Sequence, residues 1–553
     1  MNASTIATLA IPSPLSLWTT ARSFGALNLA GSFAALWALV KVLAALRWRF
    51  KTTQLRGPPR TSLVYGVSHD LGSSNDSGAM YEHWAEEYGV AYMIPSILGQ
   101  TSIVLCDPRA IAHFLARESW TYLQTSLSLA LLEGSIGKGL LWAEGEHHRR
   151  QRKALTPAFS NAAIRKLTPV FYDSAYKVKD AWDTIIESSK DGNAVIEVQN
   201  WMNHISLDTI GIAGFSHDFG SLDGKRTSVT EMFDTFGNNP QASAVNEAPV
   251  LLASAFPIIT KMPSNGTKLF KKLGVTLEKI SNELLIRSRR EKDANVSERD
   301  EEKSIIGLLL KSEGQDAELH MSKDEVVAQM KVLLLAGYET TSISLTWALL
   351  ELSQRPDAQT RLREELFAFG ADPTYDQLKA NLPFLDGVVH EVLRLHPPVR
   401  EFVRLAAADD VIPLSEPVRT ASGEMTDNIY AAKGTLITVS VPAINRSVAI
   451  WGPDAKEFKP ERWLAEGGIN GKAKEVQGHR HLLTFTDGPR TCLGKDFAIA
   501  EFKAVLLVLV KNFVFEMRDG PDTQVEVAKG ILPRPRVVGE DGIGAPLRVR
   551  RYE

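Results

Sequence analysis

Cysteine is scarce in this chain, since only Cys106 and Cys492 occur among its 553 residues. Two cysteines cannot form the disulfide framework of a secreted protein, which argues against an extracellular location. An excess of charge of one sign is also absent: 62 lysines and arginines face 65 aspartates and glutamates, for a net charge of −3. We therefore expect no nucleic-acid partner. The sequence also lacks internal repeats and low-complexity tracts, and its 44% hydrophobic residues are ordinary for a globular protein.

One of the two cysteines lies in a loop that reads F-x-x-G-x-R-x-C-x-G from Phe485 to Gly494 and precedes a helix-like run. A cysteine just before a helix meets backbone N–H groups and the positive end of the helix dipole, which favour a thiolate. A thiolate is a good axial ligand for haem iron. Gly488 and Gly494 let the backbone pass close to a flat cofactor. Arg490 offers donors suited to a haem propionate, and Phe485 can pack on the sulfur side. We predict that Cys492 binds haem.

This loop resembles the haem-binding signature of the cytochrome P-450 family, the haem-thiolate monooxygenases. The resemblance runs from about Gly57 to the C-terminus, with the other family motifs in the family's order. It implies one large, mostly α-helical domain with a small β-rich lobe near the N-terminus. Length alone, at ~150 residues per domain, suggests three or four domains. The resemblance also implies haem b as the cofactor, with its iron ligated by Cys492.

A second family motif, A/G-G-x-D/E-T-T/S, occupies residues 336–341 within an apolar, helix-like stretch at 325–354. A glycine in a buried helix costs about 1 kcal/mol relative to alanine, so Gly337 requires a reason. In the family, this glycine belongs to a groove in which dioxygen sits over the iron. Glu339 and Thr340 would then form a carboxylate–hydroxyl pair that relays protons. Alternatively, Thr340 only hydrogen-bonds to its own helix, as mid-helix threonines often do.

A third motif, E-x-x-R, is formed by Glu391 and Arg394, which are three residues apart and share a helix face. Most such pairs are solvated surface bridges, but this one lies in an apolar context that ends at two prolines. The family adds an arginine from a later P-E-R-F/W segment, where Arg462 stands in this sequence. The resemblance implies a structural triad of Glu391, Arg394 and Arg462 that registers the loop carrying Cys492.

A basic segment at 145–153 contains His148 and Arg152, which are four residues apart, like the family's propionate-binding pair. Arg404 also resembles a propionate-binding position. In the family this helix borders the proximal face, where a flavin-bearing NADPH-dependent reductase docks. We predict that the reductase contacts four cations near the haem: Arg149, Arg150, Lys153 and Lys495. The alternative is a solvated basic helix face, which is the commoner role of such runs.

The coarse pattern along the chain is mixed. Residues 92–105 have the alternating apolar character of strands, and helical patterns fill most of 109–395. Turn-rich sequence occupies 447–480, the region called the meander in the family. Short extended runs follow Phe513 and are punctuated by prolines.

The N-terminus carries an apolar run at 24–46 whose only charge is Lys41, followed by a cluster of basic residues. About 20 residues suffice to cross a bilayer as a helix, and positive flanks stay on the cytoplasmic side. A cleaved signal peptide fits less well, because the basic cluster follows the apolar run. We therefore predict a single-pass anchor in the endoplasmic reticulum membrane with a cytoplasmic catalytic domain. The division is a lumenal N-terminus at 1–23, an anchor at 24–46, a basic flank and proline hinge at 47–60, and the monooxygenase domain at 61–553.

The substrate is predicted only as a class. Apolar stretches at 127–132 and 250–259, and also Ile136, fall where family members bind or admit substrates, although they also fit an ordinary core. With the membrane anchor they favour a lipophilic substrate, such as a terpenoid, steroid, aromatic polycycle or fatty acid. The style of the motifs is most similar to that of fungal members of the family, which favours secondary metabolism or xenobiotic oxidation. Alternatives are an O2-independent haem-thiolate isomerase or dehydratase and a non-catalytic haem-bearing lipid-binding protein.

Overall fold

The computed structural model describes most of the chain after residue 45. The described residues are 31–32, 35–36, 39–40, 43, 46–237, 253, 259, 265–293, 305–314, 319–528, 532–540 and 542–553. Most of the expected anchor at 24–46 and of the apolar segment at 250–259 lies outside them. Among these residues, no helix has both the length and the apolar character needed to cross a membrane.

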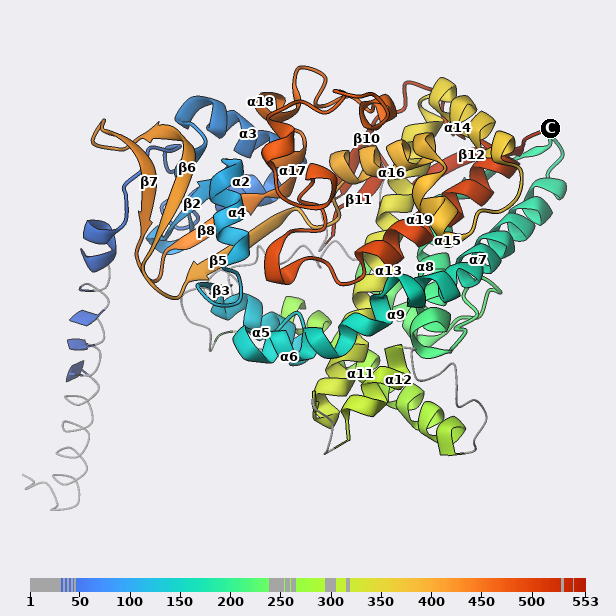
Figure 1. Cartoon of the computed structure of the whole chain (residues 1–553), viewed down its shortest axis with the longest axis horizontal. Coiled ribbons are helices and arrows are strands. Elements are labelled where there is room, and N and C mark those ends of the chain that lie inside the picture. The colour runs from blue at the N-terminus through green and yellow to red at the C-terminus, as the bar shows by residue number, and fades with distance from the viewer. Residues whose placement is uncertain are drawn as a thin grey trace, which may run out of the picture.

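Most of the described chain is α-helical, as the resemblance implied, and the helices gather in one large body (Figure 1). The helices are α2 (Ser68–Ser73), α3 (Ser77–Tyr88), α4 (Pro108–Ala116), α5 (Ser126–Ser135), α6 (Gly145–Leu155), α7 (Asn161–Glu187), α8 (Val198–Phe215), α9 (Ser228–Gly237), α11 (Asn265–Asp293), α12 (Ile305–Ser312), α13 (Lys323–Ser353), α14 (Pro356–Phe369), α15 (Tyr375–Ala380), α16 (Pro383–Leu395), α17 (Val441–Asn445), α18 (Val448–Trp451) and α19 (Lys495–Asn512).

The longest of these helices, α13, spans 31 residues and packs most extensively against α8. A capping box fixes its start, because the Ser322 hydroxyl accepts from the Glu325 N–H and the Glu325 carboxylate accepts from the Ser322 N–H. Most of its residues are buried on every side, which explains the continuous apolar character of the sequence. Gly337 lets α8 approach closely, since a Cβ there would lie 2.7 Å from Cγ1 of Ile210.

Among the described residues, the strands form four small sheets. They are β1 (Ala91–Pro95), β2 (Thr101–Leu105), β3 (Tyr122–Gln124), β4 (Asn193–Glu197), β5 (Glu401–Ala406), β6 (Asp410–Arg419), β7 (Met425–Ala431), β8 (Leu436–Ser440), β9 (Phe513–Met517), β10 (Val525–Ala528), β11 (Arg534–Val537) and β12 (Pro546–Arg551). The strands expected at 92–105 are present as β1 and β2, and the extended runs expected after Phe513 are β9 to β12.

The β-rich lobe combines early and late segments of the chain, whereas we expected it near the N-terminus. Its main sheet has the order β1-β2-β8-β5-β3, so strands from the region 401–440 lie between strands from 91–124. β2 and β8 run parallel, with Ser102 opposite Leu436, and the remaining pairs in this sheet are antiparallel. Figure 1 shows the blue and orange strands side by side at one end of the molecule. Pairing between distant segments leaves no local signal in the sequence.

The basic flank and hinge at 47–60 lie against this lobe. Arg47 and Lys51 both contact the carboxylate of Asp409, at 3.3 and 3.0 Å. Gly57 packs so closely on β1 that a Cβ there would lie 1.7 Å from the carbonyl oxygen of Met93. The flank is therefore attached to the body of the protein.

Candidate active site

The cysteine loop is closed by a backbone hydrogen bond, in which the N–H of Cys492 donates to the carbonyl of Phe485 at 2.9 Å. A short 3-10 turn, Gly488–Arg490, bends the loop, and α19 begins immediately after Gly494. The sequence therefore places the thiol at the N-terminus of a long helix, as we predicted from the pattern.

The surroundings of Cys492 both disfavour and favour its ionised form. Burial raises the pKa of the thiol, while the Gly494 N–H and the cations of Arg152 and Lys495 lower it. The residue is nevertheless accessible to solvent, although many protein atoms lie around it. The other cysteine differs, because burial and the carboxylates of Asp107 and Glu82 together raise the pKa of Cys106 to about 12, against the lowering effect of a hydrogen bond with Tyr92. Only Cys492 has the cationic setting that a thiolate requires.

The two glycines of the loop have different neighbours. Gly488 has φ +67°, and a Cβ there would lie 2.4 Å from the carbonyl oxygen of Leu115. We expected Gly488 to face a cofactor, but its visible constraint is this close approach to α4. Gly494 has the Phe159 ring 3.6 Å from its Cβ position, an ordinary packing distance.

Four predicted cofactor-binding side chains influence one another electrostatically, and one of them, Arg152, also acts on the thiol. His148 is buried on α6, and Arg152 follows one turn later. Arg490 donates to the Ala143 carbonyl and to the Glu144 carboxylate, both at 2.6 Å. The Nε of Arg404 lies 2.8 Å from the Glu118 carboxylate.

These groups influence one another electrostatically. Burial and the charges of Arg490 and Arg152 together lower the pKa of His148 to about 4. His148 is therefore neutral at physiological pH and offers a neutral N–H, in contrast to the cation that a basic segment suggests. Burial raises the pKa of Glu118, against the effects of Arg404 and Arg490.

The donor set fits a flat cofactor with two carboxylates. Three guanidinium groups lie in the neighbourhood of one thiol, and guanidinium groups pair well with carboxylates. Within the described part of the chain, the buried Nε of Arg490 and Nε1 of Trp142 have no hydrogen-bond partner, which leaves donors for a ligand. Trp142, Glu118 and Glu144 were not predicted, because no motif marks them.

Helix α13, which would lie on the side of the haem away from Cys492, is accessible to solvent at one place in its middle part. Ala336 is exposed and Thr340, one turn later on the same face, is half-buried, whereas most of the helix is buried. The Thr340 hydroxyl donates to the Ala336 carbonyl at 2.8 Å. This is the local bond that we considered as the alternative, but the exposed face keeps the hydroxyl oxygen available as an acceptor.

Glu339 points to a different partner from the one expected. Its carboxylate lies 3.2 Å from Nη2 of Arg534, on β11, and both side chains are buried. Burial raises the pKa of Glu339, and Arg534 opposes this rise. No described contact joins Glu339 to Thr340, since successive helical residues point about 100° apart. Arg534 was missed because it lies 195 residues away.

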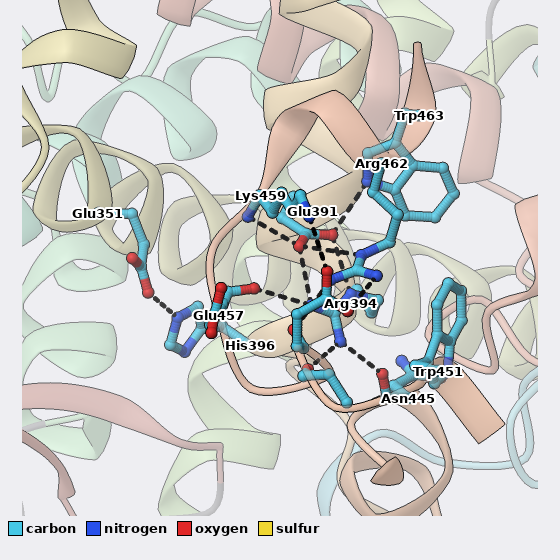
Figure 2. Close-up of polar contacts among 12 residues, drawn as sticks. Glu351, Glu391, Arg394, His396, Asn445, Trp451, Glu457, Lys459, Arg462 and Trp463 are labelled. Carbon is cyan, nitrogen blue, oxygen red and sulfur yellow. Dashed lines mark hydrogen bonds and ion pairs between the residues drawn. The ribbon is translucent and has the colours of Figure 1, made fainter. Parts of the chain in front are cut away.

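The structure brings the three expected triad residues together (Figure 2). Both oxygens of Glu391 accept from Arg394, at 2.8 and 2.9 Å, and one accepts from Arg462 at 3.5 Å. The Lys459 N–H and the Trp463 indole also donate to Glu391, at 2.9 and 3.0 Å. Arg394 in turn donates to the backbone carbonyls of Asn445, Ala455 and Glu457. This network fixes the meander against α16.

The four cations expected at the reductase surface are not equivalent. Arg149 is exposed and pairs with Glu146 at 3.3 Å. Lys153 is exposed, and Lys495 lies 3.7 Å from Asp496. Arg150 instead contacts Glu325 and the His320 carbonyl, so it joins α6 to the start of α13.

The sequence has clear relatives among known proteins. The sequence model of the family described as Cytochrome P450 matches residues 56–537. The chain is 55% identical over 540 residues to Cytochrome P450 monooxygenase claQ of Ampulloclitocybe clavipes, covering 97% of this chain and 100% of that protein. It is 33% identical over 544 residues to Cytochrome P450 monooxygenase 128 of Postia placenta, covering 95% and 97%. The chain therefore belongs to the cytochrome P450 family, and it is a haem-thiolate oxidoreductase whose iron is bound by a cysteine.

Proposed function

We propose that this enzyme inserts one oxygen atom from O2 into a lipophilic small molecule, with electrons from NADPH delivered by a separate reductase. The observation that carries the proposal is the setting of Cys492. Both cysteines precede a helix, but of the two only Cys492 lies beside cations, those of Arg152 and Lys495. One oxygen atom of O2 is inserted into a C–H bond of the substrate. The other is reduced to water by two electrons from NADPH and two protons.

The protein would hold haem between the cysteine loop and α13. Arg152, Arg404 and Arg490 supply the charges that pair with its propionates, and neutral His148 supplies an N–H. When bound, the haem supplies the activation of dioxygen that no amino-acid side chain can provide. Cys492 would supply the thiolate that binds the iron and donates electron density to it.

On the distal side, α13 would shape the reaction space. Gly337 keeps α8 close, and Ala336 and Thr340 present a small face with one hydroxyl group. The Thr340 hydroxyl would orient a proton toward the reacting oxygen, and Glu339, one residue before it, would replenish that proton. Both roles are proposals supported by the burial of Glu339 and the accessibility of the Thr340 face.

We also propose the location and the substrate class. The apolar run at 24–46 supports an anchor in the endoplasmic reticulum membrane with the catalytic domain in the cytoplasm. Helix α5, the expected substrate segment at 127–132, is apolar but only half-buried, which suits contact with a lipophilic guest. Relatives named as monooxygenases from two fungi support oxidation in fungal secondary metabolism, with a terpenoid-like substrate as the first class to test.

The decisive experiment combines a spectrum with a product assay. The purified protein, loaded with haem and reduced under carbon monoxide, should show the red-shifted Soret band of thiolate ligation. Lipophilic candidates with reductase, NADPH and 18O2 should give products that carry one labelled oxygen. A product formed without NADPH, and without label, would support the isomerase or dehydratase alternative and contradict the proposal.

A further inference from the structure

The ion pair between Glu339 and Arg534 is incompletely satisfied. Arg534 is 1% exposed and Glu339 3% exposed, and one Nη2–carboxylate contact of 3.2 Å joins them. In the described part of the protein, Nε and Nη1 of Arg534 have no hydrogen-bond partner. Buried donors of this kind are costly unless ordered water accepts from them. Two donors of Arg534 are therefore available to ordered water.

A cleft with both polar and apolar side chains in its wall is bordered by α13 and by the residue that precedes β11. Its volume is about 670 Å3, and it opens to solvent. Its wall includes Pro533, which immediately precedes Arg534, and Trp347, about two turns along α13 from Glu339. Glu526 also lines the cleft and pairs with Arg536, which lies on the same face of β11 as Arg534. The cleft therefore extends to the elements that carry both members of the buried pair.

We propose that Arg534 is a positioning residue for Glu339, and that water in this cleft supplies the protons that Glu339 passes to the distal side of the active site. The inference rests on the proposed monooxygenase function, because only that reaction consumes protons there. Each proton that leaves the Glu339 carboxyl group is replaced by one from a cleft water, and bulk solvent restores the water. Glu339 ends each cycle unchanged, and no redox partner beyond NADPH and O2 is needed.

The geometry explains why an arginine is useful at this position. One Nη2 contact fixes the carboxylate without occupying all of its acceptor sites, and the remaining donors bind water. Its positive charge also opposes the effect of burial, which otherwise raises the pKa of Glu339 and favours the neutral acid. A neutral acid with a strongly raised pKa would release its proton poorly.

Infrared titration of the haem-loaded ferric protein tests the role of Arg534 without turnover. The infrared band of the protonated Glu339 carboxyl group is identified by its absence in Glu339→Gln. In Arg534→Met, which removes the positive charge but keeps the side-chain volume, this band should persist to higher pH. Arg363→Met is the matched control, since Arg363 is also buried but binds backbone carbonyls of Val510 and Phe513. An unchanged Glu339 titration in Arg534→Met would overturn the positioning role.

A second variant keeps this test decisive if Arg534→Met does not fold. Arg534→Lys retains a charge but has fewer donors, so the same band should shift in the same direction by a smaller amount. Unfolding measurements on Glu339→Gln, Arg534→Lys and the double variant should show non-additive effects on stability. Additive effects together with an unshifted band would reject the coupling.

Filling the cleft tests the proton route. Val527→Trp places a large ring in the cleft wall, and Val538→Trp is the control on an exposed position outside it. We expect Val527→Trp to lower the product formed per NADPH and to increase the solvent deuterium isotope effect, with haem content and substrate affinity unchanged. Slower substrate binding with normal coupling would instead assign the cleft to substrate entry and overturn the proposal. If wild-type protein gave no thiolate spectrum or labelled product, the proposed function would fail, whereas the infrared result would stand by itself.

Discussion

Two buried glutamates, Glu391 and Glu339, illustrate how differently one residue type is used in this protein. Glu391 accepts hydrogen bonds from Arg394, Arg462, the Lys459 N–H and the Trp463 indole. Glu339 has a single described charged partner, Arg534, which itself keeps two donors without a partner among the described residues. Both carboxylates are at most 3% exposed, so burial does not distinguish them.

The number of donors does distinguish them. A carboxylate that accepts five hydrogen bonds is fixed in one position and one charge state, which suits a structural joint. A carboxylate with one charged partner retains acceptor sites and can exchange a proton, which suits the relay on α13. We infer that the network around Glu391, in which the carboxylate has all its hydrogen-bond donors, holds Cys492 in place. Glu339, which has fewer donors, takes part in the chemistry.

The largest effect is expected from replacing Cys492, the thiolate that the Glu391 network would hold in place. Cys492→Ser should abolish the red-shifted Soret band of the ferrous–carbonyl complex and all oxygenase activity, because an alcohol does not replace a thiolate as the axial ligand. Cys106→Ser is the control and should keep both. If Cys106→Ser lost the band and Cys492→Ser retained it, the ligand assignment would be wrong.

Isosteric amides at the two glutamates test the contrast itself. Glu391→Gln places an N–H2 group against several donors, so it should destabilise the fold by about 3–5 kcal/mol and reduce haem retention. Glu339→Gln keeps an oxygen for Arg534 and should change the free energy of unfolding by about 1 kcal/mol or less. Urea unfolding of both variants provides the measurement. Equal losses would show that donor number does not separate the two sites.

Thr340→Ala tests whether the residues next to Glu339 on α13 deliver protons. NADPH consumption should continue, while product per NADPH should fall by about tenfold or more, because positioned proton transfer contributes about 10²–10⁴-fold and water replaces only part of it. Haem content and substrate binding should not change, since the hydroxyl bonds only to its own helix. Full coupling in this variant would restrict Thr340 to packing.

The smallest effect is expected on the surface of α6. Arg149→Glu with Lys153→Glu should slow reduction by the reductase several-fold at low salt and flatten its salt dependence, because charge steers the encounter. Dithionite reduction should remain normal. Arg150→Glu is a useful contrast, since its loss of the Glu325 contact should lower thermal stability as well. If the double variant Arg149→Glu, Lys153→Glu did not change the kinetics of reduction, these residues would be a solvated helix face with no role in docking.

Local motifs in the sequence were informative where the chemistry depends on neighbouring residues. The cysteine loop, the E-x-x-R pair and the limits of α13 within about two residues follow from such patterns. Contacts between distant segments that no motif marks were not predictable: Arg534 reaches Glu339 across 195 residues, and Glu118 reaches Arg404 from another element. The contact of Arg150 with Glu325 was also not predicted, because a run of basic residues does not show which side chain turns inward.

The order of strands in the lobe has a consequence for biosynthesis. The β1–β2 hairpin emerges from the ribosome early, but its neighbour in the sheet, β8, is made more than 300 residues later. At about 5–20 residues per second, the edge of β2 waits roughly 20–70 s for its partner. During that time an unpaired strand edge is open to pairing with other chains. We expect nascent chains that stop before β8 to depend on chaperones, and the lobe to form only when synthesis is nearly complete.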